Sequence, residues 1–374
     1  MAKILYFVGE DWFFLSHFLD RAKAVRAAGH DVVVVARENV GGDAIRAAGF
    51  RFVPIKISRR GLNPLTEIIL LSQLLRIYRR EKPDLFHHVA LKPILYGTFI
   101  ARLLGKTPIV NAPVGMGFVF SSGQLLARCL RPGVRLGLHF LLNPPASKVV
   151  FENRDDLNDA IGNGVVRPED VVLIRGAGVD LVQYKYAALS SDTLNVTLVA
   201  RMLRDKGIGE FVEAARILHP RYPHVRFQLV GGPDKGNPAS FSESQLRQWN
   251  GQSGIEWLGH RNDVPELLAG SNIVCLPSYR EGLPKSLIEG MAIGRPIVTT
   301  DVPGCREVVE EGRNGLLVPP RDPVALAAAL ARLIESTALR LEFGAAGRKR
   351  AVTEFGSDIV IKETLALYDR LLPI

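Results

Sequence analysis

The sequence predicts two successive α/β domains, each with a parallel sheet covered by helices. Short apolar runs recur along the chain, and segments with apolar residues at helical spacing separate them. This alternation of strands and helices is interrupted near residue 190 and then resumes. The length of 374 residues also exceeds what a single hydrophobic core usually supports. Alternation of strands and helices favours parallel sheets that are buried on both faces.

The first domain begins with a strand, a helix and a second strand. Ile4–Val8 and Val32–Val35 are short apolar runs, and Leu15–Ala28 between them has helical periodicity and ends at Gly29. This order is typical of a βαβ unit. Further strands and helices are expected, in chain order, at Phe52–Val53, Leu65–Arg79, Leu85–Phe86, Leu95–Leu104 and Ile109–Val110.

The second domain repeats the pattern after the polar stretch Ser190–Thr193, which we expect to be the hinge. Its expected elements are Val196–Val199, the helix Gly209–Leu218, Val225–Val230, Ile255–Leu258, Ile273–Leu276, Ile297–Val298, Leu316–Val318 and a last helix at Asp358–Leu371. The predicted domains are therefore residues 1–187 at the N-terminus and 193–355 at the C-terminus. Residues 356–374 are predicted to form a C-terminal helix that crosses back.

Composition excludes several classes of protein. The chain is 47% hydrophobic and 23% charged, as soluble globular proteins are. Cys129, Cys275 and Cys305 are an odd number without metal-like spacing, which argues against a disulfide framework or a zinc ribbon. The N-terminus has no basic start followed by an apolar segment, so we expect no secretion signal and a cytoplasmic protein. Even the apolar stretch Leu125–Leu142 contains three arginines, so no membrane span is expected.

The basic excess lies entirely in the first half of the chain. Residues 1–190 contain 25 Lys and Arg against 16 Asp and Glu, whereas residues 191–374 contain 22 of each. Residues 51–150 alone have a net charge of +12. A basic surface attracts nucleic acid, acidic lipid or a phosphorylated substrate, and a merely solvated surface would have the same composition.

Two carboxylates follow the expected strand Ile273–Leu276. Glu281 lies in a turn with Gly282, and Glu289 lies eight residues later in a helix that Pro284 opens. The free amides at the start of such a helix can bind an anion. Carboxylates suit hydroxyl-rich ligands because they accept hydrogen bonds from sugar hydroxyls. A helix-capping acid followed by a surface glutamate would produce the same pattern.

Two cations follow the first strand of the second domain. Arg201 and Lys206 lie between that strand and the next helix, at the carboxyl end where α/β sheets bind ligands. Two cations there can neutralise a diphosphate, and the forked guanidinium of Arg201 can bind two oxygens. Gly231 and Gly232 end another strand and would let the backbone approach a ligand closely.

The family resemblance is carried by Arg201, Lys206 with Gly207, Gly231-Gly232, Glu281 with Glu289, and Asn314–Pro319. Together these elements resemble the retaining glycosyltransferases of family 4. That family has the GT-B fold, in which two Rossmann-like domains face each other across a cleft. The segments Glu281–Glu289 and Asp301–Glu307 resemble the branch that extends polyprenyl-diphosphate-linked glycans for capsule, O-antigen and lipopolysaccharide.

The resemblance implies a role for each of these residues. Arg201 and Lys206 would hold the nucleotide diphosphate and stabilise the leaving group. Glu281, in the catalytic set, would bind hydroxyls of the donor sugar, and Glu289 would bind the ribose. Further contacts to the nucleotide sugar are expected at Gly282, Leu283, Gly231, Gly232 and, beside the base, Leu258. By resemblance the nucleotide is UDP and the sugar a hexose or N-acetylhexosamine. No metal or other cofactor is expected, because the two cations and the helix start would replace a metal ion.

The N-terminal domain would bind the acceptor, a polyprenyl-diphosphate-linked glycan. His87 and His88 follow the expected strand Leu85–Phe86, and the resemblance places both in the catalytic set. Ordinary core or surface histidines would give the same sequence pattern. The chain departs from the family twice. Val114 stands where many relatives have an active-site His, and the loop Gly9–Trp12 lacks the usual glycine pair.

A lipid-linked acceptor would give the basic excess a use, because anionic inner leaflets attract Lys and Arg. Ile68–Arg80 and Phe118–Leu142 mix apolar residues with arginines, as interfacial helices do. A core helix with an exposed basic face explains Ile68–Arg80 equally well. We therefore expect a peripheral protein that docks on the anionic inner face of the cytoplasmic membrane.

Other functions are less consistent with the sequence. Nucleic-acid binding is disfavoured because the basic residues are not interleaved with aromatic residues that could stack on bases. A dehydrogenase is disfavoured because neither domain's first loop has a Gly-x-Gly-x-x-Gly motif. A nucleotide-sugar 2-epimerase of the same fold, and an inactive relative that serves as a scaffold for glycan assembly, remain as alternatives.

Overall fold

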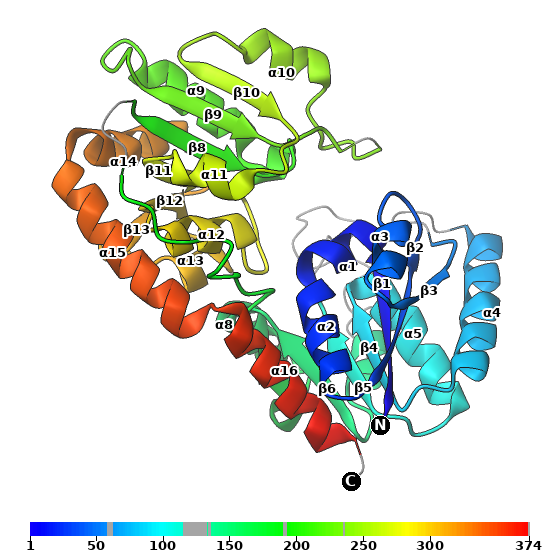
Figure 1. Ribbon diagram of the computed structural model, residues 1–374. Coiled ribbons are helices and arrows are strands. Elements are labelled where there is room, and N and C mark those ends of the chain that lie inside the picture. Colours follow the sequence, from blue (N-terminus) through cyan, green and yellow to red (C-terminus); the bar gives the residue numbers. More distant parts are fainter. Residues whose placement is uncertain (58–62, 115–132, 134–135, 190–192, 235, 373–374) are drawn as a thin grey trace. The chain divides into compact units, whose positions relative to one another are not determined.

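The structure is a computed structural model that describes residues 1–57, 63–114, 133, 136–189, 193–234 and 236–372. It divides into two compact units (Figure 1). Unit 1 is Met1–Ala177 with Val360–Ile374, and unit 2 is Gly178–Ile359. The C-terminal helix α16 (Ser357–Leu371) returns the chain to unit 1, as predicted. The division between the units follows Ala177, whereas the sequence placed the end of the first domain at residue 187.

Unit 1 has a seven-stranded parallel sheet with the strand order β3-β2-β1-β4-β5-β6-β7. Its strands are β1 (Lys3–Glu10), β2 (Asp31–Arg37), β3 (Arg51–Pro54), β4 (Leu85–Val89), β5 (Ile109–Ala112), β6 (Ser147–Phe151) and β7 (Val171–Leu173). Its helices before α16 are α1 (Asp11–His17), α2 (Leu19–Ala27), α3 (Gly42–Ala47), α4 (Pro64–Glu81), α5 (Leu91–Leu104), α8 (Arg154–Gly162) and the short η1 (Pro168–Asp170).

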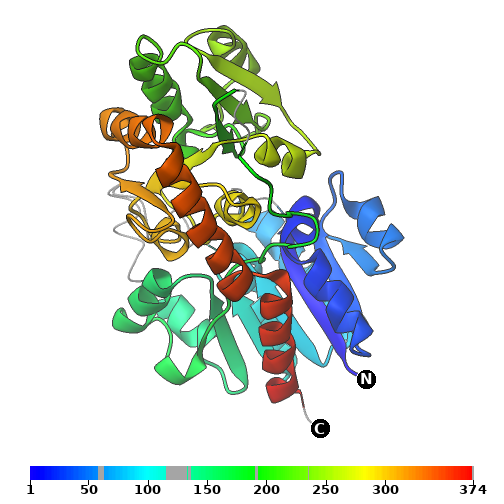
Figure 2. The ribbon, with the colours of Figure 1, turned by 60° about the vertical axis from the view of Figure 1, so that its left-hand side comes forward.

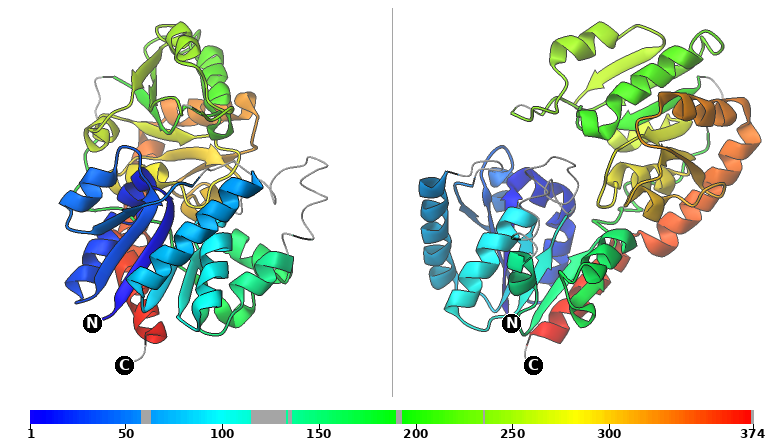
Figure 3. Two further views of the ribbon diagram at one scale, coloured as in Figure 1. Left: turned by 90° about the vertical axis from the view of Figure 1, so that its right-hand side faces the viewer. Right: turned by 180° about the vertical axis from the view of Figure 1, so that it is seen from behind.

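Both faces of this sheet are buried, because alternate residues of its strands belong to different cores. Ile4 and Tyr6 of β1 pack in a core with α1, α2 and α16. Leu5 and Phe7 pack in a second core with α4 and α5, which lie together on that face (Figure 3). A strand that is buried on both faces has a continuous apolar sequence, which explains the runs seen in the sequence.

Helix α16 joins the first of these cores through a buried polar cluster. The hydroxyl of Tyr368 in α16 lies 2.8 Å from the hydroxyl of Tyr6 and 2.5 Å from Nδ1 of His87. Burial raises the pKa of Tyr6 to about 12, so its hydroxyl is neutral at physiological pH. The cluster fixes the returning helix beside the strands of unit 1 (Figure 2).

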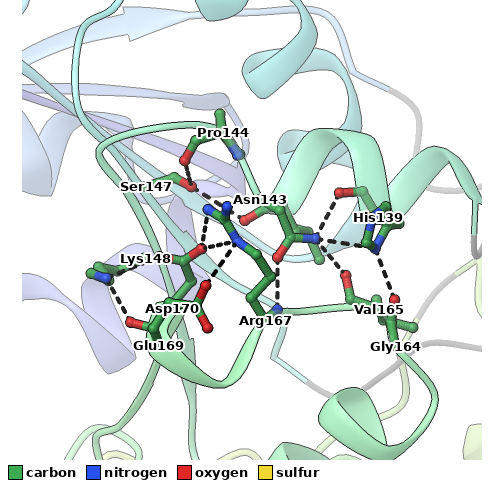
Figure 4. Close-up of polar contacts among 11 residues, drawn as sticks. His139, Asn143, Pro144, Ser147, Lys148, Gly164, Val165, Arg167, Glu169 and Asp170 are labelled. Atoms are coloured by element: carbon green, nitrogen blue, oxygen red, sulfur yellow. Dashed lines mark hydrogen bonds and ion pairs between the residues drawn. The ribbon is translucent and has the colours of Figure 1, made fainter.

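Residues 136–142 are helical and precede β6, and Asn143 fixes the end of this segment (Figure 4). The Asn143 amide nitrogen donates to the carbonyls of His139 (2.7 Å) and Val165 (2.9 Å). Its Oδ1 accepts the backbone N–H of Arg167 (2.7 Å). These bonds attach the helical segment to the part of unit 1 that leads into β7. Of the predicted interfacial helix Phe118–Leu142, all residues before 136 except Gly133 lie outside the described residues.

Unit 2 has a six-stranded parallel sheet with the order β10-β9-β8-β11-β12-β13. Its strands are β8 (Asn195–Val199), β9 (Arg226–Val230), β10 (Ile255–Gly259), β11 (Ile273–Leu276), β12 (Ile297–Thr300) and β13 (Gly315–Val318). Its helices are η2 (Arg204–Lys206), α9 (Ile208–Leu218), α10 (Glu243–Trp249), α11 (Val264–Ala269), α12 (Lys285–Ile293), α13 (Cys305–Val308), α14 (Pro323–Glu335) and α15 (Thr337–Glu354). The predicted hinge residues 190–192 lie outside the described residues.

The two sheets share one strand order. In each sheet, the first strand (β1 or β8) lies between the second strand and the fourth. The chain therefore adds strands first on one side of that strand and then on the other. This is the Rossmann order, and such sheets bind ligands beyond the carboxyl ends of their strands, where the order reverses. In unit 2 that point lies between β8 and β11, the strands that carry the predicted cations and carboxylates on the loops that follow them.

Candidate active site

The loops that follow four strands of unit 2 contact one another at the carboxyl edge of its sheet. Met202, after β8, donates its backbone N–H to the carbonyl of Gly232 after β9 (3.1 Å). The hydroxyl of Ser278, after β11, donates to the carbonyl of Asp205 after β8 (3.0 Å). Thr300, at the end of β12, donates its hydroxyl to the Ser278 carbonyl. Residues that are far apart in the sequence therefore form one continuous edge.

Two glycines make this packing of loops feasible. Gly231 has a φ of +144°, and a Cβ there would lie 1.8 Å from the carbonyl oxygen of Ala200. Gly304 has a φ of +80°, and its Cβ would lie 2.5 Å from the carbonyl oxygen of Gly282. Only glycine tolerates such backbone angles and contacts. In the structure, the absence of a side chain at Gly231 lets the neighbouring protein backbone come close. That Gly231 also lets the backbone approach a ligand stays a prediction.

Lys206 and Glu281 form an ion pair at this edge. Lys206 Nζ lies 2.5 Å from Glu281 Oε1, and the two side chains are 18% and 11% exposed. The sequence pointed to these residues through separate motifs, and strand order brings them together because β8 and β11 are neighbours. Glu281 is thus paired with a cation. The N-cap residue of α12 is Pro284 and no side chain among the described residues caps this helix, so the interpretation of Glu281 as a helix-capping acid is wrong.

Arg201, the second predicted cation, has a different carboxylate partner. Its Nη1 lies 2.5 Å from Oδ2 of Asp234, and the Arg201 side chain is exposed. Sequence reasoning missed Asp234. Its only signal was an acidic residue two positions after Gly232, at the carboxyl end of β9.

Glu289 lies in the second turn of α12 and is buried, so the interpretation as a surface glutamate is wrong. Lys285 Nζ lies 3.5 Å from its Oε1. Burial raises the pKa of Glu289, and Lys285 and Tyr184 partly oppose this effect. Tyr184 was missed because nothing in its local sequence distinguishes it. Pro284 is the N-cap residue of α12, so the helix begins one residue later than predicted.

The remaining predicted contacts lie around the same edge. Gly282 lies in the loop that Gly304 approaches, whereas the Leu283 side chain is buried in the core of unit 2. Leu258 is half-buried near the end of β10. Its neighbour Trp257 donates its indole N–H to the carbonyl of Gly231 (2.9 Å), which connects β10 to the loop after β9.

His87 and His88 lie inside β4, because this strand extends to Val89 and the prediction that it ends at Phe86 is wrong. Both side chains are buried in unit 1. His87 Nδ1 lies 2.5 Å from the Tyr368 hydroxyl, while its Nε2 has no hydrogen-bond partner among the described residues. Burial, with the positive charge of Arg21, lowers the pKa of His87 well below its usual value.

His88 is satisfied on both ring nitrogens. Its Nε2 lies 3.0 Å from the Tyr78 hydroxyl, and its Nδ1 lies 3.1 Å from both Thr98 Oγ1 and Asn111 Oδ1. Burial lowers the pKa of His88 to about 3. These partners explain how a polar strand can be buried, and they give both histidines a packing role. A catalytic role for either histidine stays a prediction.

The first loop of unit 1 is organised by acids where the family usually has glycines. Asp11 begins α1, and its Oδ2 accepts the backbone N–H groups of Asn39 (2.6 Å) and Gly41 (2.8 Å). Glu10 accepts a bond of 2.5 Å from the side chain of Asn39. Val114 is half-buried beside the first core of unit 1, and the Gly115-Met116-Gly117 element lies outside the described residues.

The described residues contain neither a cluster of metal-ligating side chains nor a helix suited to span a membrane. No group of three or more His, Cys, Asp or Glu side chains gathers there as a metal site would require. In the same part of the chain, no helix has the length and apolar character needed to cross a bilayer.

Comparison with known proteins identifies the family. The model described as "Glycosyl transferase 4-like" matches residues 3–151, and "Glycosyl transferases group 1" matches residues 193–336. The chain is 27% identical over 364 residues to the N,N'-diacetylbacillosaminyl-diphospho-undecaprenol alpha-1,3-N-acetylgalactosaminyltransferase of Campylobacter jejuni, with 94% of each chain covered. It is 25% identical over 315 residues to the UDP-Gal:alpha-D-GlcNAc-diphosphoundecaprenol alpha-1,3-galactosyltransferase of Escherichia coli, covering 80% of this chain and 77% of the relative.

Solved structures agree in fold. The crystal structure of Anabaena Alr3699/HepE in complex with UDP and glucose matches with a TM-score of 0.77 and 20% identity, covering 99% of this chain and 100% of that one. The predicted GT-B architecture of two Rossmann-like domains is thereby confirmed. The chain belongs to the glycosyltransferases of family 4 and is an enzyme that transfers glycosyl groups.

Proposed function

We propose that this glycosyltransferase moves a hexose or N-acetylhexosamine, with retention at the anomeric carbon, from a UDP-sugar to a glycan carried on polyprenyl diphosphate. The product would serve capsule or lipopolysaccharide synthesis. The observation that carries the proposal is the Lys206–Glu281 ion pair at the point where the strand order of unit 2 reverses. The names of the Campylobacter and Escherichia relatives supply the acceptor class, and the Escherichia name supplies the nucleotide.

The ion pair suits a nucleotide sugar because it places a cation and a carboxylate one hydrogen bond apart. In such a donor the β-phosphate and the sugar are covalent neighbours. A diphosphate bound to Lys206 would replace Glu281 as the partner of the ammonium group, and Glu281 could then accept hydrogen bonds from sugar hydroxyls. When the donor binds, Lys206 and Glu281 would thus exchange each other for the diphosphate and the sugar, at a charged site that exists before binding.

The chemical step breaks the bond between the anomeric carbon and the β-phosphate oxygen, while an acceptor hydroxyl oxygen bonds to that carbon on the same face and passes its proton to the departing diphosphate. Negative charge develops on the departing diphosphate. Lys206 and Arg201 would stabilise that charge, together with the backbone amides at the start of α12. We propose that these groups replace a metal ion and that the enzyme requires none.

A transfer assay tests the function directly. The full-length protein is incubated with a panel of UDP-sugars, with and without a polyprenyl-diphosphate-linked glycan, and both the sugar and the lipid products are analysed. We expect turnover that depends on the acceptor. Conversion of the UDP-sugar without acceptor would instead identify an epimerase, and nucleotide binding without turnover under either condition would support the scaffold alternative.

We also propose that one face of unit 1 docks on an anionic membrane. Half of the large exposed hydrophobic residues among the described residues lie on α4, α5 and residues 136–142. They are Leu65, Ile68 and Ile69, then Phe99, Leu103 and Leu104, and finally Leu136 and Phe140. Helix α5 shares one core with α4 and another with residues 136–142, so these three helical segments lie on neighbouring parts of one surface.

Charge on these helices favours a bilayer with acidic headgroups. Arg76, Arg79 and Arg80 in α4 and Arg102 in α5 are exposed. At the same time α4 buries Leu70 and Leu74, so it is both a core helix and a candidate surface helix. Basic side chains beside exposed apolar ones are the pattern of an interfacial segment, in which apolar burial and attraction to anionic lipid add together.

Flotation with vesicles tests this docking. We expect the protein to float with vesicles that contain anionic lipid, less so at high salt, and not with zwitterionic vesicles. Ile68→Ser combined with Phe140→Ser should reduce flotation. Val324→Ser combined with Leu341→Ser removes two exposed residues of unit 2 and is the matched control. Flotation that is indifferent to salt and lipid charge, or equal loss in both double variants, would refute the assignment of this face.

A further inference from the structure

The loop that contains Lys206, between β8 and α9, is held against the loop after β11 on both sides of Lys206. Before it, the carbonyl of Asp205 accepts the backbone N–H of Tyr279 (2.8 Å). After it, Gly207 has a φ of +71°, and a Cβ there would lie 2.0 Å from the carbonyl oxygen of Pro277. The backbone of Lys206 therefore lies between two close contacts with the neighbouring loop.

The side chain of Tyr279 makes a further contact, with the helix that follows Lys206. Its hydroxyl donates to Oε1 of Glu210 in the first turn of α9 (2.6 Å). Burial, with the hydrogen bond to Glu210 and its charge, raises the pKa of Tyr279 to about 12, so the hydroxyl keeps its proton at physiological pH. The guanidinium carbon of Arg321 lies over the Tyr279 ring, 4.7 Å from its centre. Tyr279 is thus held through its backbone, its ring and its hydroxyl.

The segment that joins Lys206 to Glu210 has little order of its own. It is Gly207-Ile208-Gly209, and glycine has the widest choice of backbone conformations. A Cβ at Gly209 would meet no atom within 4 Å, so the surroundings do not confine this residue. The hydrogen bond from Tyr279 to Glu210 therefore supplies a restraint that the segment itself lacks.

The contacts of Tyr279 also lie outside the exchange that donor binding would bring about. In the proposed function, Lys206 leaves Glu281 when the diphosphate binds, so the ion pair that holds its side chain in the free enzyme would be lost. The bonds of Tyr279 to Asp205 and Glu210 use neither of those two charged groups. They would remain, and they would determine where the backbone of Lys206 lies while the bond between sugar and phosphate breaks.

We propose that Tyr279 is a positioning residue for the leaving group: through its bond to Glu210 it fixes the start of α9, and hence the Lys206 ammonium, where charge develops on the departing diphosphate. This role rests on the proposed function, in which Lys206 binds the diphosphate. Electrostatic stabilisation is effective when the charged group is already in place before the reaction. A misplacement of about 1 Å can cost about 10²-fold in rate.

The variant Tyr279→Phe removes the hydroxyl and keeps the ring and the backbone N–H. With the full-length protein, a UDP-sugar and a polyprenyl-diphosphate-linked glycan, we expect kcat to fall about tenfold, less than for a full misplacement because the bond to Asp205 remains. The KM for the UDP-sugar should change less than about twofold, since the charge on the diphosphate is greatest in the transition state. The number of UDP sites per chain, measured by calorimetry, should equal that of the wild type, which would exclude a loss of folded enzyme.

Two variants at the other end of the bond test whether the hydroxyl acts through Glu210. Glu210→Ala removes the acceptor and should lower kcat about tenfold, whereas Glu210→Gln keeps an oxygen acceptor and should retain more activity. Tyr279→Phe combined with Glu210→Ala should lie within about twofold of either single variant, because both changes break one bond.

Tyr222→Phe is the matched control. Tyr222 follows the other end of α9 and likewise donates its hydroxyl to a carboxylate, that of Glu335 in α14. We expect this variant to have unchanged kcat and KM. An equal fall in kcat for Tyr222→Phe and Tyr279→Phe would mean that any loosening of α9 impairs the enzyme, and it would refute the specific role of Tyr279.

The remaining outcomes separate the role of Tyr279 from the proposed function. If Lys206→Met lowers kcat and Tyr279→Phe does not, the positioning role is refuted and the proposed function stands. If the effects of Tyr279→Phe and Glu210→Ala multiply in the double variant, the two residues act independently and the positioning role is also refuted. If Lys206→Met transfers sugar at the wild-type rate, the assignment of the diphosphate to Lys206 fails and the role of Tyr279 with it. Absence of transfer by the wild type would refute the proposed function itself.

Discussion

Replacement of Lys206 by Met tests the pairing at the centre of the candidate site. The change removes one charge and keeps most of the side-chain stem. With side chains 18% and 11% exposed, the Lys206–Glu281 pair is more buried than a surface ion pair, which contributes about 0–1 kcal/mol. It is less buried than a pair for which loss of one partner costs about 3–5 kcal/mol. We therefore expect a loss of about 2 kcal/mol, or a fall in melting temperature of about 4–8 °C for a domain of this size.

The pair formed by Arg261 and Asp263 is the matched control. It has the same 2.5 Å separation, but its side chains are 43% and 42% exposed. Arg261→Met should therefore lower the melting temperature by less than about 2 °C. The double variant Lys206→Met with Glu281→Gln should recover part of the lost stability, since it removes the carboxylate that was left unpaired. Equal shifts for the two single variants would mean that burial does not determine the strength of this pair.

The same variant should impair transfer more than it impairs folding. Loss of a group that stabilises charge in the transition state typically costs about 10²–10³ in kcat, and Lys206 would act on the departing diphosphate. Transfer of radiolabelled sugar at a temperature well below the melting transition measures this directly. Lys206→Arg keeps the charge and should retain more activity than Lys206→Met. Near-normal turnover by Lys206→Met would refute the role of this cation.

Three further changes test other parts of the site. Glu289→Gln should weaken UDP binding, and it should raise the melting temperature at about pH 8 but not at about pH 4. Folding raises the pKa of this carboxyl. Such a group stabilises the folded state below its unfolded pKa and loses that contribution as the pH rises. An unchanged melting temperature at both pH values would contradict this. Gly231→Ala should destabilise the protein and abolish UDP binding, since its Cβ would lie 1.8 Å from a carbonyl oxygen, whereas Gly209→Ala, with no atom within 4 Å, should be tolerated. Transfer should survive EDTA; activity that is lost in EDTA and restored by manganese would refute metal independence.

The buried histidines of unit 1 illustrate a limit of local reasoning. The two polar residues suggested that the strand ended at Phe86, yet β4 continues through both of them to Val89. What permits this is a set of partners contributed by α4, α5, β5 and α16, including Tyr78 and Tyr368. A buried imidazole costs little when such partners satisfy it, and no pattern in the neighbouring sequence indicates that they exist.

The sequence by itself determined the alternation of strands and helices, the parallel sheets and the loops that carry the cations and acids. These properties follow from periodicity and turn residues, which act between neighbours along the chain. Only the tertiary structure decided the partners: Lys206 with Glu281 across 75 positions, and Arg201 with Asp234. Such contacts depend on which strands lie side by side and on which segments pack against a helix. Spacing along the chain does not specify either, because side chains meet in space after the sheet has assembled.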